Sequence, residues 1–163
     1  MKTLDELINT VEPGIDLVNE WISEAYNRVE LLPASDQHEN VLLSLQVTTR
    51  SPMGAIAYET GGILVDDGWL RFRGSGHERI PRPLDGHDYE KGYLIIADDA
   101  VGGFFAINGG ALGDDPAMIY YLPPDNLDWV PLEIGYSAFF EWSLSKNLAD
   151  FYLDLRWTTW KED

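Results

Sequence analysis

Three short apolar runs between Tyr93 and Leu122 constrain the fold of this chain more than any other feature. The runs cover residues 93–97, 104–107 and 117–122, and segments rich in Gly and Asp separate them. Runs of this length bounded by turn residues are typical of antiparallel strands with one buried face. Gly102-Gly103 supplies the backbone freedom that a tight turn needs. The sequence therefore predicts a three-stranded meander.

A hairpin is predicted just before this meander. Asp66-Asp67-Gly68 is a turn signal that lies between two apolar runs at 63–65 and 69–72. The segment 74–92 has almost no periodicity, and a loop of that length in a compact domain is often functional. An irregular apolar segment at 127–132 predicts a last edge strand.

Helices are predicted on both sides of the strands from apolar residues at helical spacing and from capping signals. They are expected at residues 4–12, 13–27, 36–46, 52–59, from Ser137 to Leu144, and from Leu148 toward Trp157. In 36–46 the apolar residues also alternate as in a strand, although a helix is preferred.

Two breaks are expected between these helices. The residue before a proline avoids helical geometry, so Leu31-Leu32-Pro33 is predicted to interrupt the chain. Gly61-Gly62 is predicted to cap the helix at 52–59. The order of helices, then strands, then helices predicts one α+β domain over 1–163, an antiparallel meander sheet flanked by N- and C-terminal helices. Residues 1–50 form its helical extension and 51–157 its core.

The net charge of −17 limits the classes of partner. This charge repels nucleic-acid phosphates and anionic lipid surfaces, so we expect neither as a ligand. The sequence holds no cysteine, and no apolar run is long enough to cross a bilayer. We therefore expect a cytoplasmic location, and no metal or other cofactor.

Acidic doublets provide the first candidate site. Alternate turns of a meander lie at the same edge of the sheet, so Asp66, Asp67, Asp98 and Asp99 are expected to share one edge and Asp114-Asp115 the other. Two doublets on one edge would steer a cationic partner. The alternative interpretation is that aspartate simply favours turns.

Basic residues provide the second candidate site. Arg71, Arg73, Arg79 and Arg82, together with His77, are concentrated in and beside the predicted loop. Arginine binds phosphate and carboxylate groups through bidentate hydrogen bonds, which makes an anion or nucleotide site one interpretation. The other is that these arginines pair with the abundant carboxylates of the chain itself.

Aromatic residues crowd the C-terminal third, where most are expected in the core. Trp129 and Trp160 lie at predicted ends of elements and are candidates for exposed partner contacts. The sequence contains no histidine spacing typical of a metal site and no nucleophile motif. An acidic pair acting as a hydrolase remains a third, weaker hypothesis, and we expect no enzymatic activity.

The sequence resembles the SUKH superfamily, also called the SMI1/KNR4-like domain. The segments that carry this resemblance are Gly61-Gly62, residues 97–107, 119–121 and 137–140. The whole chain also resembles a related bacterial family of unknown function (DUF2625-like). That likeness rests on residues 48–52, Gly61-Gly62, 74–76, 135–137 and 155–157.

The superfamily resemblance implies an α+β binding domain without catalytic residues, and many bacterial members are immunity proteins that neutralise a toxin. It therefore implies a protein partner, such as a basic toxin. With that partner, we expect Asp66, Asp67, Asp98, Asp99 and Trp129 to make the contact. The long loop and the two N-terminal helices depart from the usual pattern.

Overall fold

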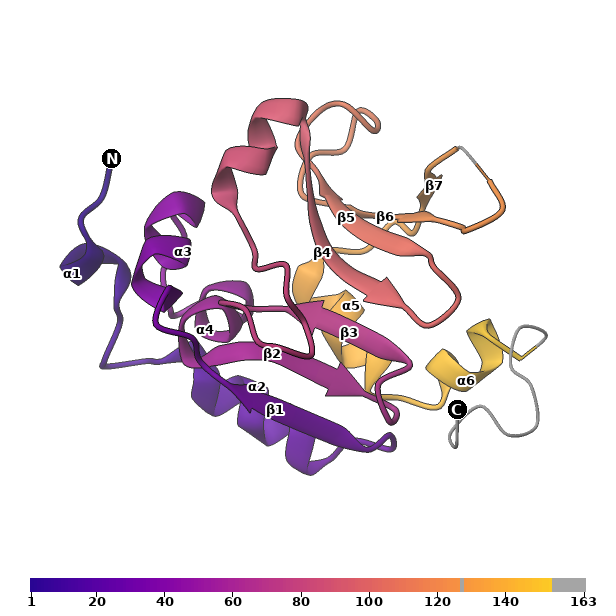
Figure 1. The fold of residues 1–163 in the computed structure, drawn as a ribbon, viewed down its shortest axis with the longest axis horizontal. Helices are drawn as coiled ribbons and strands as arrows, with labels where there is room; N and C mark the ends of the chain where they lie inside the picture. The colour runs from indigo at the N-terminus through magenta and orange to yellow at the C-terminus, as the bar shows by residue number, and fades with distance from the viewer. Residues whose placement is uncertain (127, 154–163) are drawn as a thin grey trace.

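The computed structural model describes residues 1–126 and 128–153. Seven strands form one sheet in which each strand pairs antiparallel with the next along the chain (Figure 1). The strands are β1 (Val29–Pro33), β2 (Thr60–Val65), β3 (Leu70–Arg73), β4 (Tyr93–Asp99), β5 (Phe104–Asn108), β6 (Ile119–Leu122) and β7 (Val130–Pro131). The predicted α+β class and antiparallel meander are confirmed, and the meander extends over the whole sheet.

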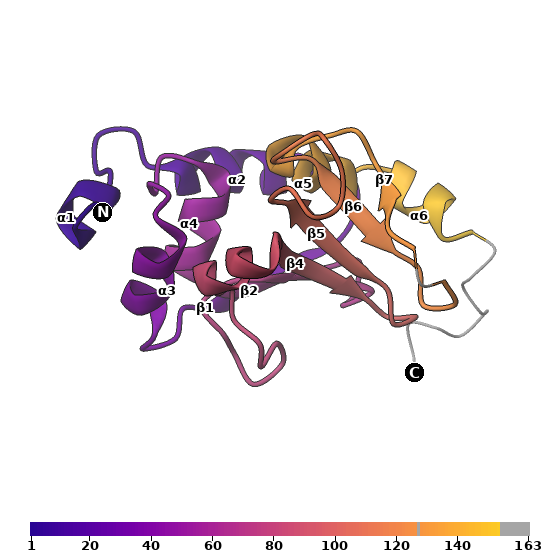
Figure 2. The same cartoon turned by 90° about the horizontal axis from the view of Figure 1, so that it is seen from above.

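Helices cover one face of this sheet. The helices of the structure are α1 (Leu4–Leu7), α2 (Gly14–Ser23), α3 (His38–Leu45), α4 (Pro52–Glu59), α5 (Tyr136–Ser143) and α6 (Asn147–Phe151), with the 3₁₀-helix η1 (Gly86–Lys91) before β4. Figure 2 shows α2, α4, α5 and α6 on the same side of the strands. Fully buried Phe72, Phe105, Phe139 and Phe140 pack there, with the rings of Phe72 and Phe140 5.0 Å apart. This face therefore holds the main core.

The predicted long loop covers part of the opposite, outer face. Its first residues continue the pairing of β2 and β3, because the N–H of Ser75 donates to the carbonyl of Thr60 at 2.9 Å. Further on, Ile80 packs in a separate small cluster with Leu32 and Leu64. The loop is thus fixed to the outer face, and η1 at its end is an element that the sequence did not predict.

The expected break at Leu31-Leu32-Pro33 is wrong, because these residues belong to β1. Leu31 pairs with Ile63 and Leu32 with Gly62. A proline is tolerated at this place because an edge strand leaves one row of its N–H groups unpaired. Residues 1–50 are therefore not purely helical, since they contribute a strand to the sheet.

The predicted helix cap at Gly61-Gly62 is also wrong. Both glycines lie inside β2, which follows α4 directly. A Cβ at Gly61 would lie 2.4 Å from the carbonyl oxygen of Pro33 and 2.6 Å from that of Gly76. Glycine is required here because the backbones of β1 and the long loop approach β2 closely, not because a helix ends.

Several helix ends differ from the prediction. The first helix ends at Leu7 rather than near residue 12, because Asn9 Oδ1 accepts from the N–H groups of Val11 and Glu12 and forms a turn. In α2, Pro13 is the N-cap rather than the first helical residue, and the helix ends at Ser23. In α5, Gly135 rather than Ser137 is the N-cap. The helix at Pro52–Glu59, the helical choice for 36–46 and the edge strand near residue 130 are confirmed. The predicted helix toward Trp157 is α6 up to Phe151, and its later part, like Trp160, lies outside the described residues.

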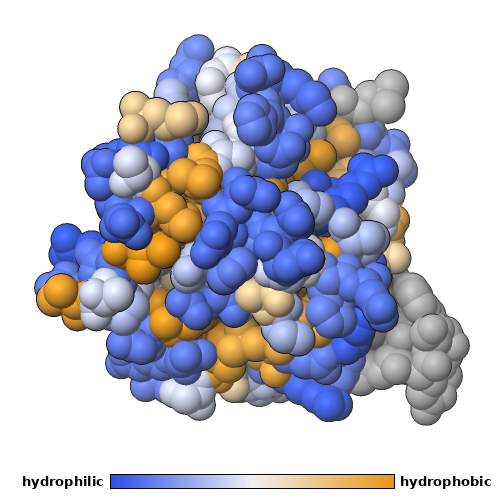
Figure 3. Space-filling model, turned by 60° about the vertical axis from the view of Figure 1, so that its left-hand side comes forward, coloured by the Kyte–Doolittle hydropathy of each residue, from blue (hydrophilic) through white to orange (hydrophobic). Residues whose placement is uncertain are grey.

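The surface carries most of the charge of this acidic chain. Figure 3 shows a mainly hydrophilic face with several separate hydrophobic areas. The most exposed large hydrophobic side chains, Met1, Val11, Tyr26 and Leu153, lie on different parts of the chain. Within residues 1–126 and 128–153, no helix has the length and apolar character needed to cross a membrane.

Candidate functional site

Arg71 and Arg73 share the outer face of β3, because alternate residues of a strand point to the same side. Gly62 lies opposite Arg73 and Asp98 lies opposite Arg71 in the neighbouring strands. Asp98 Oδ1 accepts from Nε of Arg71 at 2.6 Å and lies 2.5 Å from Nη2 in the same ion pair. The charge of Arg71 is thus compensated within the sheet.

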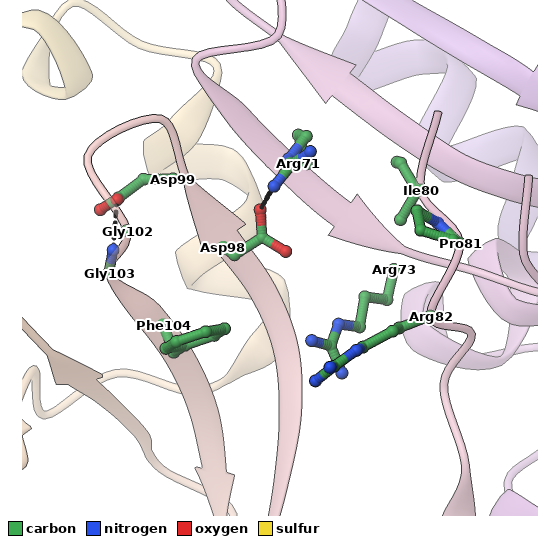
Figure 4. Close-up of a pocket in the computed structure, with 10 residues that line it drawn as sticks. All are labelled: Arg71, Arg73, Ile80, Pro81, Arg82, Asp98, Asp99, Gly102, Gly103 and Phe104. Atoms are coloured by element: carbon green, nitrogen blue, oxygen red, sulfur yellow. Dashed lines mark hydrogen bonds and ion pairs between the residues drawn. The ribbon is translucent and has the colours of Figure 1, made fainter. Parts of the chain in front are cut away.

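A cavity of about 290 Å³ opens beside this ion pair, and we call it the arginine pocket (Figure 4). The long loop lines one end of it and the turn between β4 and β5 the other. Its lining consists of Arg71, Arg73, Ile80, Pro81, Arg82, Asp98, Asp99, Gly102, Gly103 and Phe104.

Arg73 is the distinctive residue of the arginine pocket. Only 5% of it is exposed, its Nε has no hydrogen-bond partner, and it forms no ion pair among the residues described. Burial lowers the pKa of Arg73 from its usual value, the nearby carboxylates of Asp98 and Asp88 raise it, and the charges of Arg82 and Arg71 lower it. The guanidinium stays protonated because arginine starts from so high a value. The pocket therefore contains a buried positive charge without a bonded counter-charge.

Arg82 adds a second positive charge beside the first. Figure 4 shows its guanidinium next to that of Arg73, pointing into the same space. The side chain of Arg82 is exposed and makes no ion pair with the part of the chain that the structure describes. The guanidinium groups of Arg73 and Arg82 therefore lie together at one end of the arginine pocket.

Two of the predicted basic residues lie elsewhere. Arg79 forms an ion pair with Glu30 on β1. His77 Nδ1 accepts from the backbone N–H of Arg79 at 3.2 Å. The structure thus brings together Arg71, Arg73 and Arg82 of the predicted set, and it separates Arg79 and His77 from them.

The four aspartates of the predicted acidic patch do lie at one edge of the sheet, but three of them are buried or held in an ion pair. Asp66 is buried, and Asp98 is held by Arg71. Asp99 is 3% exposed and accepts from the hydroxyls of Tyr121 and Tyr152. The exposed member, Asp67, lies 3.4 Å from Nη1 of Arg28. Partner binding at these residues stays a prediction, and they do not form a continuous exposed acidic surface.

Trp129, the other predicted contact residue, is half-buried. Its ring lies 5.4 Å from that of Tyr93. Part of the ring is therefore used for packing within the chain, and its role in partner contact stays a prediction.

Phe104 is an aromatic pocket residue that was not predicted from the sequence. It pairs with Asp98 across the β4–β5 hairpin and is only half-buried. The turn at Gly102-Gly103 was a usable signal, since a hairpin closed at these glycines places Phe104 opposite the acidic doublet.

Within the described ranges, no three His, Cys, Asp or Glu side chains gather as metal ligands.

The fold and the site define a mixed α+β protein built on one antiparallel meander sheet, with an arginine-lined cavity on its outer face. The family described as "Protein of unknown function DUF2625" matches residues 4–163, and the chain belongs to this family. It is 45% identical over 169 residues to the uncharacterized protein YbfG of Escherichia coli (strain K12), covering all of this chain and 78% of that protein. It is 38% identical over 173 residues to an uncharacterized protein of Haemophilus influenzae, covering 76% of the latter. These relatives establish membership of the family and assign no activity.

Proposed function

We propose that this protein binds a small phosphate-bearing anion in the arginine pocket, without transforming it. The observation that carries this proposal is the buried guanidinium of Arg73, which has no hydrogen-bonded or ion-paired partner among the described residues. An isolated buried charge costs several kcal/mol, so such a residue is retained where a ligand supplies the opposite charge. Arg82 supplies a second fork, and guanidinium groups match the geometry of phosphate oxygens.

Binding of inorganic phosphate to the wild type and to Arg73→Met tests the proposal. A ligand at about 100 times its Kd stabilises a protein by about 2.7 kcal/mol. For a chain of this size that shift raises Tm by roughly 5–11 °C. We expect the wild type to show such a rise with phosphate and Arg73→Met to lose it. Arg79→Met is the matched control, because Arg79 lies in the same loop with its charge outside the pocket.

The stability of unliganded Arg73→Met is a second readout of the same experiment. A buried charge without a partner destabilises the free protein, so the variant should be more stable than the wild type by about 1 kcal/mol or more. Urea unfolding in a buffer free of phosphate and sulfate measures this difference. An Arg73→Met protein that is less stable, or that still responds to phosphate, would show that Arg73 has a structural role instead.

A second candidate function is binding of a basic protein partner, as the SUKH resemblance implies, and the net charge of −17 favours it. The exposed Asp67 is the carboxylate best placed for such a contact. This proposal predicts that Asp67→Lys weakens a complex with a basic toxin encoded beside the gene. The SUKH relationship, the immunity role and the cytoplasmic location belong to this proposal and stay predictions.

A further inference from the structure

We infer that the anion is a nucleoside monophosphate, with its phosphate between Arg73 and Arg82 and its base against the ring of Phe104. This inference rests on the proposed function and specifies the ligand of the same pocket. The features that carry it are the charge of the pocket, its volume, its apolar end and an unused acceptor in its wall.

Charge and volume indicate a single phosphate group. Asp98 neutralises Arg71, which leaves the two charges of Arg73 and Arg82 uncompensated by bonded partners within 1–126 and 128–153. A phosphate monoester carries a charge between about −1.5 and −2 at neutral pH, which matches them. The volume of about 290 Å³ lies at the lower end of the range for ligand cavities. A phosphate with a sugar fits this space better than a di- or triphosphate.

The end of the pocket opposite the arginines is suited to a flat ring. Phe104 is partly exposed there and lines the pocket together with Gly102 and Gly103. Figure 4 shows the ring of Phe104 across β4 from the two arginines. Stacking of a base on an aromatic side chain contributes to affinity without selecting one base.

Asp98 gives the wall between the two ends a hydrogen-bond acceptor. Its Oδ1 forms the hydrogen bond and ion pair with Arg71, and its Oδ2 accepts no hydrogen bond from the described residues. A carboxylate oxygen lining a cavity selects a ligand that carries O–H or N–H donors, as a ribose or a base does. A polynucleotide is disfavoured because the net charge of −17 repels a chain of phosphates.

Calorimetric titration of the full chain with adenosine 5′-monophosphate, ribose 5-phosphate, phenyl phosphate and inorganic phosphate tests this inference. Stacking on an aromatic ring predicts that the nucleotide binds about 5- to 150-fold more tightly than ribose 5-phosphate. Phenyl phosphate has a ring but no donor for Asp98, so it should bind more weakly than the nucleotide. The nucleotide preference should fall toward one in Phe104→Leu and be retained in Phe104→Trp.

The possible failures are distinguishable. If phosphate binds in an Arg73-dependent way but the nucleotide binds no more tightly than ribose 5-phosphate, the inference is overturned and the proposed function stands. A preference that is unchanged in Phe104→Leu, or phenyl phosphate binding as tightly as the nucleotide, overturns it as well. If no phosphate compound binds in an Arg73-dependent way, both proposals fail.

Discussion

Asp99 lies at the end of β4 as a buried carboxylate with hydrogen bonds to both of its oxygens. Oδ1 accepts from the N–H groups of Val101 and Gly103, and Oδ2 from the hydroxyls of Tyr121 and Tyr152 at 2.7 and 2.6 Å. Since Tyr152 directly follows α6, this network ties the C-terminal helix to the turn that lines the arginine pocket. A glycine is required at 103, because a Cβ there would lie 2.4 Å from the hydroxyl of Tyr121.

The two tyrosines make the free energy of unfolding depend on pH in the alkaline range. Burial, together with the charge of Asp99, raises the pKa values of Tyr121 and Tyr152 far above the usual 10.0. The folded protein therefore keeps protons that the unfolded chain releases above pH 10, so the free energy of unfolding should fall as pH rises beyond that point. Below pH 10 both states hold these protons and the stabilisation is complete.

Tyr152→Phe tests this network. The variant should lose about 1–3 kcal/mol of stability at neutral pH, because Asp99 stays buried with one donor fewer. Its stability should also fall less steeply than that of the wild type above pH 10, and urea unfolding at several pH values measures both effects. Tyr26→Phe is the control, since 65% of Tyr26 is exposed. Equal slopes for Tyr152→Phe and the wild type would mean that the raised pKa of Tyr152 does not contribute to alkaline unfolding.

At the scale of elements, packing of the long loop on β2 positions Arg82. A Cβ at Gly62 would lie 2.6 Å from Cδ1 of Ile80 and 2.8 Å from the carbonyl oxygen of Phe72. The absence of a side chain at Gly62 therefore lets Ile80 pack closely against β2, and Arg82 follows only two residues later. Close packing at Gly62 therefore helps to fix the loop conformation and the cationic end of the pocket.

Gly62→Ala should displace Ile80 and move Arg82. We expect a loss of about 1–3 kcal/mol from overpacking, measured by urea unfolding. Phosphate affinity, measured by calorimetry, should also fall. Gly110→Ala is the matched control, because Gly110 also has a positive φ but no atom within 4 Å of the added Cβ. Equal phosphate affinity in the two variants would show that the loop does not position Arg82 through Ile80.

The sequence predicts an element well where local signals and tertiary contacts agree. The helix at Pro52–Glu59 has Ser51 as a capping residue and Pro52 at its first position, and it forms within the predicted limits. β1 was missed because Pro33 is a local break signal, whereas pairing with β2 is a contact between segments about thirty residues apart. Gly61-Gly62 was misinterpreted for the same reason, since the close backbones that require glycine come from distant parts of the chain.

At the scale of the whole molecule, the candidate site was predictable only in part. The cluster of arginines is visible in the sequence, but pairing across the fold decides which of them are left without an ion-pair partner among the described residues. Arg79 forms an ion pair with Glu30, 49 residues away in the sequence, and Arg71 forms one with Asp98, 27 residues away. Arg73 has no such partner, because it lies opposite Gly62 in the neighbouring strand. No local sequence pattern shows this pairing.

The net charge of −17 also gives the two proposed functions opposite responses to salt. Raising NaCl from about 10 to about 150 mM shortens the Debye length from about 30 to about 8 Å. This screens both the repulsion between phosphate and the exposed carboxylates and the attraction to exposed Arg82, two effects that oppose each other, whereas contact with buried Arg73 is screened less because buried pairs are less accessible to ions. The Kd for inorganic phosphate, measured by calorimetry, should therefore stay within about threefold or decrease.

The affinity of a complex with a basic protein should decrease as salt is raised, because the attraction comes from exposed charges of opposite sign. Its affinity should fall by about tenfold or more over the same range of salt. Arg79→Met, titrated in parallel with phosphate, shows how much of the salt response comes from exposed charge alone. A loss of phosphate affinity comparable to that of the protein complex would contradict binding at Arg73, because it would place the anion among solvent-screened side chains.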